Sequence, residues 1–304
     1  MEQKFYSNGK LLITGEYLVL DGALAFALPT KFGQNLIIEP NQTGFLSWKS
    51  FDADESCWLE TEITFDEIRN KIPFDESQKI KTTLTEILHE AHKLNPNLIL
   101  KSKGFNVKTE LTFPKNWGLG TSSTLINNIA QWFQIDAFEL LKNSFGGSGY
   151  DIACAQNNLP IFYQIENEKP SVTQISFNPV FKDSVYFVYL NQKQNSKTAI
   201  ENYRNKRNDL KLAINKINEL SKLIASTNDY KIFCEAIQDH EQILSEVLNQ
   251  KTIKNQFFSD FDGTIKSLGA WGGDFVMAVS KKNPTFYFES KGYKTILAYR
   301  EMML

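Results

Sequence analysis

Two glycines followed by hydroxyl residues lie at the junction of an expected strand, residues 105–109, and an expected helix, residues 125–133. The first turn of a helix leaves backbone N–H groups unpaired and carries partial positive charge. Glycine lets backbone approach an oxygen-rich ligand, and Ser or Thr hydroxyls can reach phosphate oxygens or Mg²⁺. The run from Pro114 to Thr124 is therefore expected to cradle a phosphate, although no Lys follows its glycines as in a Walker A loop. The alternative is an ordinary strand-to-helix turn with a Ser/Thr cap.

A second glycine-rich bend, residues 145–149, precedes an expected apolar helix that opens near Asp151. Three glycines around Ser148 lose much conformational entropy on folding, which is unfavourable in a segment that serves only as a linker. A carboxylate held at this helix start could orient or deprotonate a substrate hydroxyl during phosphoryl transfer. The alternative is that Ser148 or Asp151 only caps the helix.

Two charged residues, Lys10 and Glu16, stand among apolar neighbours near the N-terminus, and charges in such company are seldom buried without partners. A third glycine cluster, between Gly269 and Gly273, is followed by Asp274 and an expected apolar strand. Such a cluster indicates that the backbone must come close to another group. Lys10, Glu16, Asp274 with its glycine cluster, and Asp151 are therefore the candidates for catalysis or ligand binding.

Strands and helices of ordinary length are expected to position these residues. A β-meander is expected over residues 3–40, with a turn at residues 7–10 and a hairpin turn at Asp21-Gly22. His89 and His92 lack the pattern of a metalloprotease, so no metal site is expected there, and His240 has no evident partner. The other expected elements are helices at 77–94, 136–142, 197–226 and 229–250, and strands at 161–163, 172–175, 185–190, 285–288 and 295–299.

Length and composition set the class of protein. A chain of 304 residues with 42% hydrophobic residues suits one large globular domain or two packed ones. The net charge, 33 − 35 = −2, argues against nucleic-acid binding as the main purpose. Three scattered cysteines fit a reducing compartment and neither a zinc site nor a disulfide framework. No signal region or membrane-spanning run is evident, so we expect a cytoplasmic protein with no membrane partner.

Three motifs resemble, in order, those of the GHMP small-molecule kinases, which include galactokinase, homoserine kinase, mevalonate kinase and phosphomevalonate kinase. The first runs from Gly9-Lys10 to Gly15-Glu16-Tyr17, with Ser7-Asn8 where the family usually has Pro. The second runs from Pro114 to Ser123, with Thr121 in place of the first Ser. The third is Gly269-Ala270-Trp271-Gly272-Gly273-Asp274, with Trp271 in place of a glycine. Ser148-Gly149-Tyr150-Asp151 also resembles the family's Ser-Gly-x-Asp.

The resemblance covers residues 9–279 and implies the two-part α+β fold of this family. Residues 1–160 would form a ribosomal-protein-like βαβ domain that binds ATP, and residues 161–304 a ferredoxin-like domain. The implied activity is transfer of the ATP γ-phosphoryl group to a small molecule, with ATP and Mg²⁺ as cofactors, by a monomer or homodimer.

The resemblance also implies roles for individual residues. Asp151 would orient the acceptor, and Lys10 would neutralise charge near the transferred group. The residues implied to hold the nucleotide are Pro114, Gly118, Leu119, Gly120, Thr121, Ser122 and Ser123. Those implied to bind the acceptor are Glu16, Ser148, Gly149, Lys193, Ser196, Lys197, Gly269, Gly272, Gly273 and Asp274. Mg²⁺ would be bound by Ser122, Ser123 and Glu139, although Leu140 holds the place of the family's usual Glu.

The motif variants Gly-Glu-Tyr, Gly-Ser-Gly-Tyr-Asp and Gly-Gly-Asp resemble phosphomevalonate kinases most, with mevalonate as the next substrate. A phosphorylated acceptor needs added positive charge, for which Lys193, Lys197 and Lys266 are candidates. The alternatives are a diphosphomevalonate decarboxylase, a homoserine or sugar kinase, and a homologue that binds nucleotide without turnover.

Overall fold

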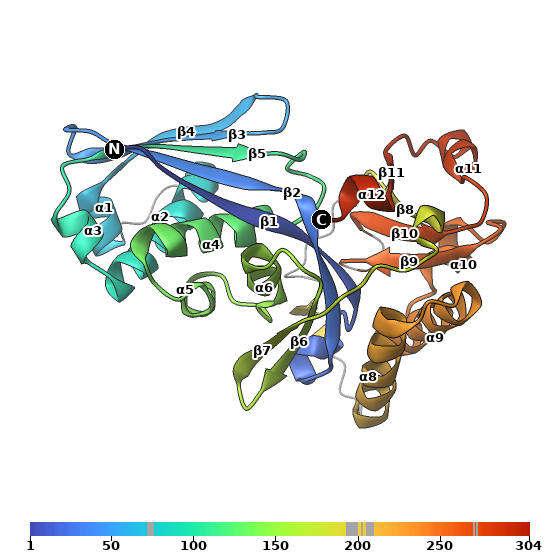
Figure 1. Ribbon diagram of the computed structural model, residues 1–304. Helices are drawn as coiled ribbons and strands as arrows, with labels where there is room; N and C mark the ends of the chain where they lie inside the picture. The colour runs from blue at the N-terminus through green and yellow to red at the C-terminus, as the bar shows by residue number, and fades with distance from the viewer. Residues whose placement is uncertain (72–75, 193–199, 202, 205–209, 270, 272) are drawn as a thin grey trace. The chain divides into compact units, whose positions relative to one another are not determined.

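Two long strands, β1 (Gln3–Thr14) and β2 (Ala25–Pro40), pair with each other and contribute to both compact units of the chain. The computed structural model describes residues 1–71, 76–192, 200, 201, 203, 204, 210–269, 271 and 273–304 (Figure 1). Each unit is built from separate stretches of sequence, and the domain division at residue 160 stays a prediction. Unit 1 comprises Met1–Gly9, Phe32–Lys115 and Leu119–Gln156, and unit 2 comprises Lys10–Lys31, Asn116–Gly118 and Asn157–Leu304.

The strands of unit 1 have the order β4-β3-β5-β2. Besides the second half of β2 they are β3 (Phe45–Phe51), β4 (Cys57–Thr64) and β5 (Phe105–Leu111). β5 runs parallel to β3 and antiparallel to β2. Along β5 the side chains alternate between buried and more exposed, because one face of the sheet packs on the core. The strand predicted at residues 105–109 is thereby confirmed.

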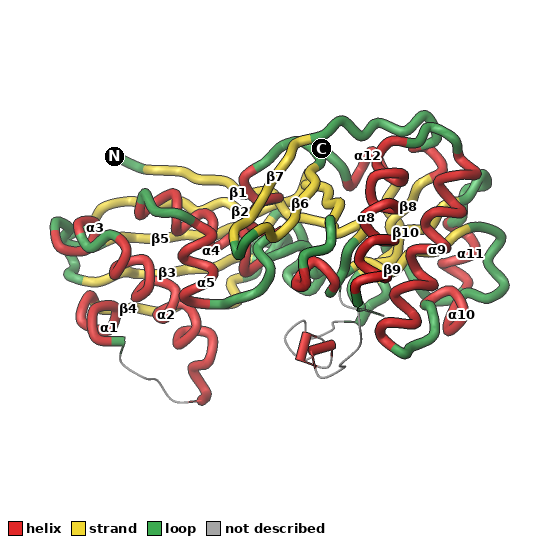
Figure 2. The backbone as a smooth tube through the Cα atoms, turned by 90° about the horizontal axis from the view of Figure 1, so that it is seen from below, coloured by secondary structure: helices red, strands yellow, loops and turns green. Residues whose placement is uncertain are grey.

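Helices cover one face of this sheet, as Figure 2 shows for α2, α4 and α5. Their apolar sides and the inner face of the sheet share one core, which includes Trp48, Leu88, Ile126 and Phe133. The helices of unit 1 are α1 (Phe65–Asn70), the 3₁₀ helix η2 (Glu76–Gln78), α2 (Lys79–Leu94), α3 (Asn97–Leu100), α4 (Thr121–Phe133), α5 (Ala137–Ser144) and α6 (Tyr150–Gln156). α2, α4 and α5 confirm helices predicted from the sequence.

Unit 2 contains a four-stranded antiparallel sheet with the order β11-β8-β10-β9. Its strands are β8 (Val185–Tyr189), β9 (Thr264–Leu268), β10 (Phe275–Val279) and β11 (Ile296–Ala298). In the same unit the start of β2 pairs with β6 (Ile161–Glu166), and β6 pairs with β7 (Lys169–Gln174). β9 and β10 form a hairpin in which Leu268 pairs with Phe275, so Gly269 and Gly273 of the third glycine cluster lie in the loop that joins them.

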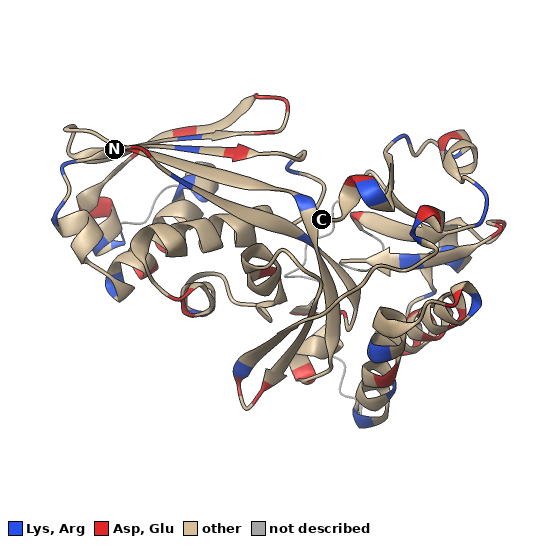
Figure 3. Cartoon of the chain, viewed as in Figure 1, with Lys and Arg blue, Asp and Glu red and all other residues tan. Residues whose placement is uncertain are grey.

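Two long helices of unit 2, α8 (Lys211–Ser226) and α9 (Tyr230–Leu248), pack against each other, and α9 packs on β9. They bury Ile217 and Ile224 from α8, and Ile237 and Leu244 from α9, while basic and acidic residues are interspersed along both helices (Figure 3). The shorter helices are η1 (Leu18–Asp21), η3 (Lys182–Ser184), α10 (Ile253–Phe257), α11 (Thr285–Ser290) and α12 (Tyr299–Met302). Among the described residues, no helix is both long enough and apolar enough to cross a membrane.

Three local predictions are wrong, and the structure shows a physical reason for each. The turn predicted at residues 7–10 lies inside β1, where the buried Ser7 hydroxyl bonds to helix α4. The stretch 17–20 of the predicted meander is not a strand, because Gly15 and Tyr17 adopt positive φ of 87° and 62° and η1 follows. The strand predicted at residues 285–288 is helix α11, whose first N–H, on Thr285, donates to Oδ1 of Asn283.

Candidate active site

The first and second motifs meet where Nζ of Lys10 donates a hydrogen bond to the carbonyl oxygen of Gly118, at 3.0 Å. Lys10 lies in β1, and Gly118 lies in the loop between β5 and α4, 108 residues further along the chain. Both residues belong to unit 2, and the Lys10 side chain is half-buried. The predicted catalytic Lys is therefore held at the predicted phosphate-binding loop.

The third motif reaches the same glycine through Asp274. A Cβ built on Gly118 would lie 2.1 Å from Oδ2 of Asp274, and one built on Gly269 would lie 3.4 Å from that oxygen. Gly118 also has φ of 70°, in the left-handed region that side chains disfavour. A side chain at position 118 would therefore strain the backbone and also clash with the carboxylate of Asp274. Lys10, Gly118 and Asp274, one from each motif, therefore come together within unit 2.

Aromatic residues of β8 and β10 fix the segment before Gly118. The Tyr189 hydroxyl donates to the carbonyl of Asn116 at 3.1 Å, and the Trp117 ring lies edge-on to Phe275, with ring centroids 5.5 Å apart. Burial and the negative charge of Asp274 raise the pKa of Tyr189, which keeps this hydroxyl protonated. Sequence reasoning did not single out Tyr189, because an aromatic residue in a buried strand is ordinarily only part of the core.

Helix α4 starts without a side-chain cap. Its N-cap is Gly120, with φ of 101°, and no side chain accepts a hydrogen bond there. The hydroxyl of Ser123 instead donates back to the carbonyl of Gly120, at 2.9 Å. The Ser/Thr cap that the alternative of an ordinary turn required is therefore absent at this helix start. Because the uncapped N–H groups and the exposed Ser122 lie together, this helix start suits a phosphate group.

A buried polar network in unit 1 anchors α4 to β1 and β2. The Ser7 hydroxyl donates to Oδ1 of Asn128 at 2.7 Å and accepts from Nδ2 of Asn127 at 2.8 Å. Thr124 Oγ1 donates to Oε1 of Gln34 at 2.8 Å, and Nδ2 of Asn128 donates to the Gln34 carbonyl at 2.9 Å. All these side chains are buried, so each bond also satisfies a group that water cannot reach. The network fixes how α4 lies on the sheet.

Asp151 lies in the first turn of α6, with its side chain half-buried. α6 packs on α4 within unit 1, and Nε2 of Gln156 donates to Oδ1 of Asn127 at 3.1 Å. Ser148 and Gly149 precede this helix, and the Gly149 carbonyl accepts from the N–H of Ala153. The predicted base is therefore carried by a helix that packs directly on the predicted phosphate-binding helix.

The residues predicted to bind Mg²⁺ also belong to unit 1. Ser122 is exposed, Ser123 is buried, and Glu139 is exposed in the first turn of α5, while Leu140 is buried in the core. Hydroxyl and carboxylate oxygens are ligands that suit this ion. No group of three or more His, Cys, Asp or Glu side chains with metal-binding geometry occurs in the described part of the chain. Binding of Mg²⁺ by these residues stays a prediction.

Glu16 and Lys266 are buried together in unit 2, with 3% and 0% of their surfaces exposed. Lys266 donates a hydrogen bond to Oε1 of Glu16, so it lies inside the protein and is not a surface cation for a phosphorylated acceptor. This corrects the suggestion made from the sequence for Lys266, whereas a role for Glu16 in binding the acceptor stays a prediction. Lys193, Ser196, Lys197 and Gly272 lie outside the described residues.

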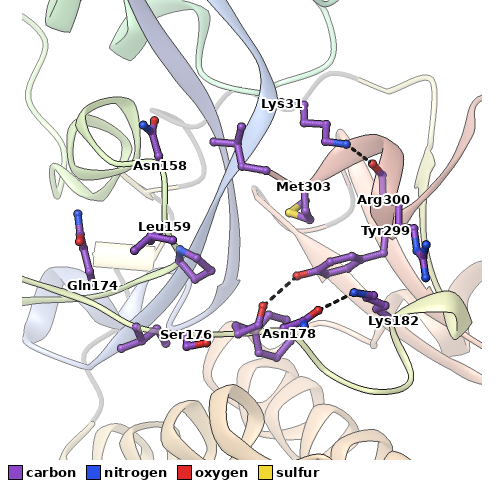
Figure 4. Close-up of a pocket in the computed structure, with 14 residues that line it drawn as sticks. Lys31, Asn158, Leu159, Gln174, Ser176, Asn178, Lys182, Tyr299, Arg300 and Met303 are labelled. Carbon is purple, nitrogen blue, oxygen red and sulfur yellow. Dashed lines mark hydrogen bonds between the residues drawn. The ribbon is translucent and has the colours of Figure 1, made fainter.

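A pocket of about 810 Å³ opens elsewhere in unit 2 (Figure 4). Lys31, Lys182 and Arg300 line it together with apolar residues such as Leu159 and Met303. Nζ of Lys31 donates to the Arg300 carbonyl at 2.6 Å, and Nζ of Lys182 donates to a side-chain oxygen of Asn178 at 2.7 Å. None of its lining residues is among those predicted to form the active site, so we distinguish it from the site at Gly118.

Comparisons with known proteins give matches in structure and none in sequence. No protein-family model matches the chain, and no curated protein matches its sequence. Mevalonate kinase from Methanococcus jannaschii is similar to it with a TM-score of 0.69 and 14% sequence identity, over 98% of this chain and 97% of that chain.

Phosphomevalonate kinase from Streptococcus pneumoniae, in complex with phosphomevalonate and AMPPNP, is similar with a TM-score of 0.69 and 14% identity, over 95% of each chain. Galactokinase from Lactococcus lactis, in complex with galactose, is similar with a TM-score of 0.69 and 12% identity, over 100% of this chain and 93% of that chain. Similarity at these identities shows a shared fold across nearly the whole chain.

Proposed function

We propose that this chain, which has the fold of the GHMP small-molecule kinases, transfers a phosphoryl group from ATP to mevalonate or phosphomevalonate. One observation carries the proposal. Lys10, Gly118 and Asp274 come from three motifs far apart in the sequence and meet within one unit. Such convergence is expected if each motif serves the same reaction, and local folding alone does not require it.

The start of α4 is proposed to hold the phosphate groups of the nucleotide. The uncapped N–H groups after Gly120 would donate to phosphate oxygens, and the exposed Ser122 hydroxyl would take part in binding phosphate or Mg²⁺. When bound, ATP supplies the phosphoryl group, and Mg²⁺ neutralises part of its charge. The polar network at Ser7 and Asn128 would keep the helix start in place.

Lys10 and Asp151 are proposed to act on the reacting groups. Lys10 would place positive charge near the transferred phosphoryl group, where negative charge spreads during transfer. Asp151 would accept the proton of the acceptor hydroxyl or hold that hydroxyl in line. Both side chains are half-buried, so protein groups would replace part of the water around them. Their cooperation is inferred from the resemblance in sequence.

The acceptor is proposed from the motif variants and from two of the structural neighbours. Gly15-Glu16-Tyr17 and Gly273-Asp274 resemble phosphomevalonate kinases, and a structure of that enzyme is among the similar ones. A galactokinase with galactose is equally similar in fold, so a sugar acceptor is the second candidate. Lys193 and Lys197 are proposed to supply the added positive charge that a phosphorylated acceptor needs.

A coupled assay of ADP formation tests the proposal. The acceptors are mevalonate, phosphomevalonate, homoserine and galactose, and diphosphomevalonate is assayed for release of carbon dioxide. We expect mevalonate or phosphomevalonate to raise ADP formation far above the rate without acceptor. Stimulation by galactose alone would overturn the choice of acceptor, and binding of ATP with no stimulation by any acceptor would favour a nucleotide-binding homologue without turnover.

If phosphomevalonate is the acceptor, Lys193→Ala and Lys197→Ala should raise its KM by about tenfold, because each removes one charged contact to phosphate. Lys216→Ala, a change of a lysine on α8 with no predicted role in the site, serves as the control. Equal KM values in all three variants would refute the proposed contacts.

A further inference from the structure

Four ionisable side chains meet inside unit 2, and we call them the Glu16 cluster: Glu16, Lys266, Glu241 and His240. Each has at most 3% of its surface exposed. Nζ of Lys266 donates to Oε1 of Glu16 and lies 2.9 Å from Oε1 of Glu241. Nε2 of His240 lies 3.6 Å from Oε2 of Glu16. One cation therefore stands between two carboxylates where water cannot reach any of them.

The cluster joins three elements of unit 2. Glu16 belongs to the turn after β1, Lys266 lies in β9, and His240 and Glu241 lie in α9. The backbone N–H of Gly15 donates to Nε2 of His240 at 3.1 Å, so the ring carries its proton on Nδ1 and is neutral. Burial and the charge of Lys266 hold the pKa of His240 well below its usual value.

These elements carry two of the residues that meet at Gly118. β1 carries Lys10, and β9 pairs with β10, whose preceding residue is Asp274. The bond between Glu16 and Lys266 therefore ties the end of the strand that bears Lys10 to the hairpin that presents Asp274. A second tie runs in parallel, because the backbone N–H of Trp271 donates to the Tyr17 hydroxyl at 2.9 Å.

We propose that Glu241, acting through Lys266, is a positioning residue for the reaction at Gly118, because it competes with Glu16 for Lys266 and so sets how firmly the first motif is tied to the third. The inference rests on the proposed function. Glu241 lies in none of the three motifs, and only the fold brings it to them. Its carboxylate does not touch Lys10, Gly118 or Asp274 in the described contacts, so its effect must pass through Lys266.

The charges of the Glu16 cluster should make the activity depend on pH near neutrality. Burial raises the pKa of Glu16 to about 7, against the opposing pull of Lys266, and burial raises the pKa of Glu241 as well. On balance the two carboxylates raise the pKa of Lys266 although burial lowers it. Near neutral pH the two carboxylates thus compete for one cation, and a proton on Glu16 weakens its bond to Lys266.

Ionisable groups face Glu16 from each element packed against it. Lys266 comes from β9, Glu241 and His240 come from α9, and the Tyr17 hydroxyl comes from the turn that holds Glu16. Burial raises the pKa of Tyr17, and His240 stays neutral, so neither changes charge near pH 7. A change in activity near pH 7 that depends on Glu241 would therefore arise from the two carboxylates and Lys266.

The test measures kcat/KM against pH for the acceptor that the coupled assay identifies, in the full-length protein. In the wild type we expect activity to fall as pH drops through about 7, when Glu16 takes up a proton. Glu241→Gln removes the competing charge, so Lys266 pairs with Glu16 alone and the midpoint should move down by about one pH unit. Glu16→Gln should abolish this step and lower kcat/KM by about tenfold.

Glu235→Gln is the matched control, because Glu235 is exposed on the same helix and pairs only with Lys231 among the described ion pairs. It should leave both the midpoint and the Tm unchanged. A Glu241→Gln variant with a lower Tm but an unshifted pH profile would overturn the inference, since that is the result of a merely structural role. Absence of turnover in the wild type would refute the proposed function first, and the positioning role would fail with it.

Discussion

Asp274 holds its carboxylate so close to Gly118 that a Cβ built on the glycine would lie 2.1 Å from Oδ2. The two residues are brought together by the β9–β10 hairpin and by the aromatic contacts of Trp117 with Phe275. Neither residue's neighbours in sequence indicate this contact. It makes Gly118 a sensitive position, because the same residue accepts the hydrogen bond from Lys10.

Gly118→Ala should lower kcat/KM of the proposed reaction by about 10²-fold, since the added methyl group displaces either Asp274 or the loop. The measurement is steady-state kinetics with varied ATP. Gly44→Ala is the control, because Gly44 has φ of 84° and nothing lies within 4 Å of its built Cβ. That variant should lose only about 1 kcal/mol of stability and keep its activity. Unchanged kinetics in Gly118→Ala would contradict a role for this contact.

Asp151→Asn should reduce turnover by about 10²-fold or more while the fold stays intact, because the amide cannot accept a proton from the acceptor. Turnover and the thermal unfolding curve are measured together. Asp229→Asn is a suitable comparison, since Asp229 caps α9 by accepting from the N–H groups of Lys231 and Ile232 and Asn caps equally well. Near-normal turnover in Asp151→Asn would exclude Asp151 as the base.

Stability should depend on pH through Glu16. Its pKa is raised to about 7 in the folded protein from an ordinary 4.5, so the folded state binds the proton more tightly than the unfolded state. The stability that Glu16 contributes is therefore complete below pH 4.5 and is lost as pH rises toward 7, at about 1.4 kcal/mol per pH unit. Chemical unfolding of the wild type and of Glu16→Gln at several pH values measures this. A constant difference between the two proteins from pH 4.5 to 7 would show that Glu16 does not titrate in this range.

Ser7→Ala should lower the free energy of unfolding by about 1–3 kcal/mol, because Asn127 and Asn128 each lose a buried partner. The variant should also raise the KM for ATP, since the network anchors the helix that begins at Gly120. Ser226→Ala, at an exposed position where the hydroxyl bonds only within its own helix among the described contacts, should change stability by less than about 0.5 kcal/mol. Equal unfolding curves for the two variants would argue that the network does not anchor α4.

The glycine-bearing motifs could be found from the sequence because their backbone needs restrict them to a few residue types. Gly118 and Gly120 adopt left-handed backbone, as glycines at a tight approach do, and the hydroxyl residues after them begin a helix as predicted. The partners of these motifs could not be found, because His240, Glu241 and Tyr189 lie far from the motifs in sequence, inside regular elements where no local pattern indicates a partner. Only the tertiary fold shows which of them meet charged groups.

The elements with clear periodicity were predicted well, and those with local turn signals were not. α2, α5 and α9 follow their apolar spacing, and Asp136 caps α5 by accepting from the N–H groups of Phe138 and Glu139. Ser7 to Lys10 have the composition of a turn, yet the buried bonds of Ser7 keep β1 extended through them. Tyr17 shows the opposite case, since a backbone of φ 62° and ψ −52° breaks a run of residues that favour strands.

The way β1 and β2 pass from one unit to the other limits how the protein can be dissected. A fragment that begins at residue 161 lacks Lys10–Lys31 and Asn116–Gly118, which belong to the same compact unit. It would lose the strand that pairs with β6, and it would leave Lys266 and Glu241 without the carboxylate of Glu16. Expression of residues 161–304 alone is therefore expected to give insoluble chain.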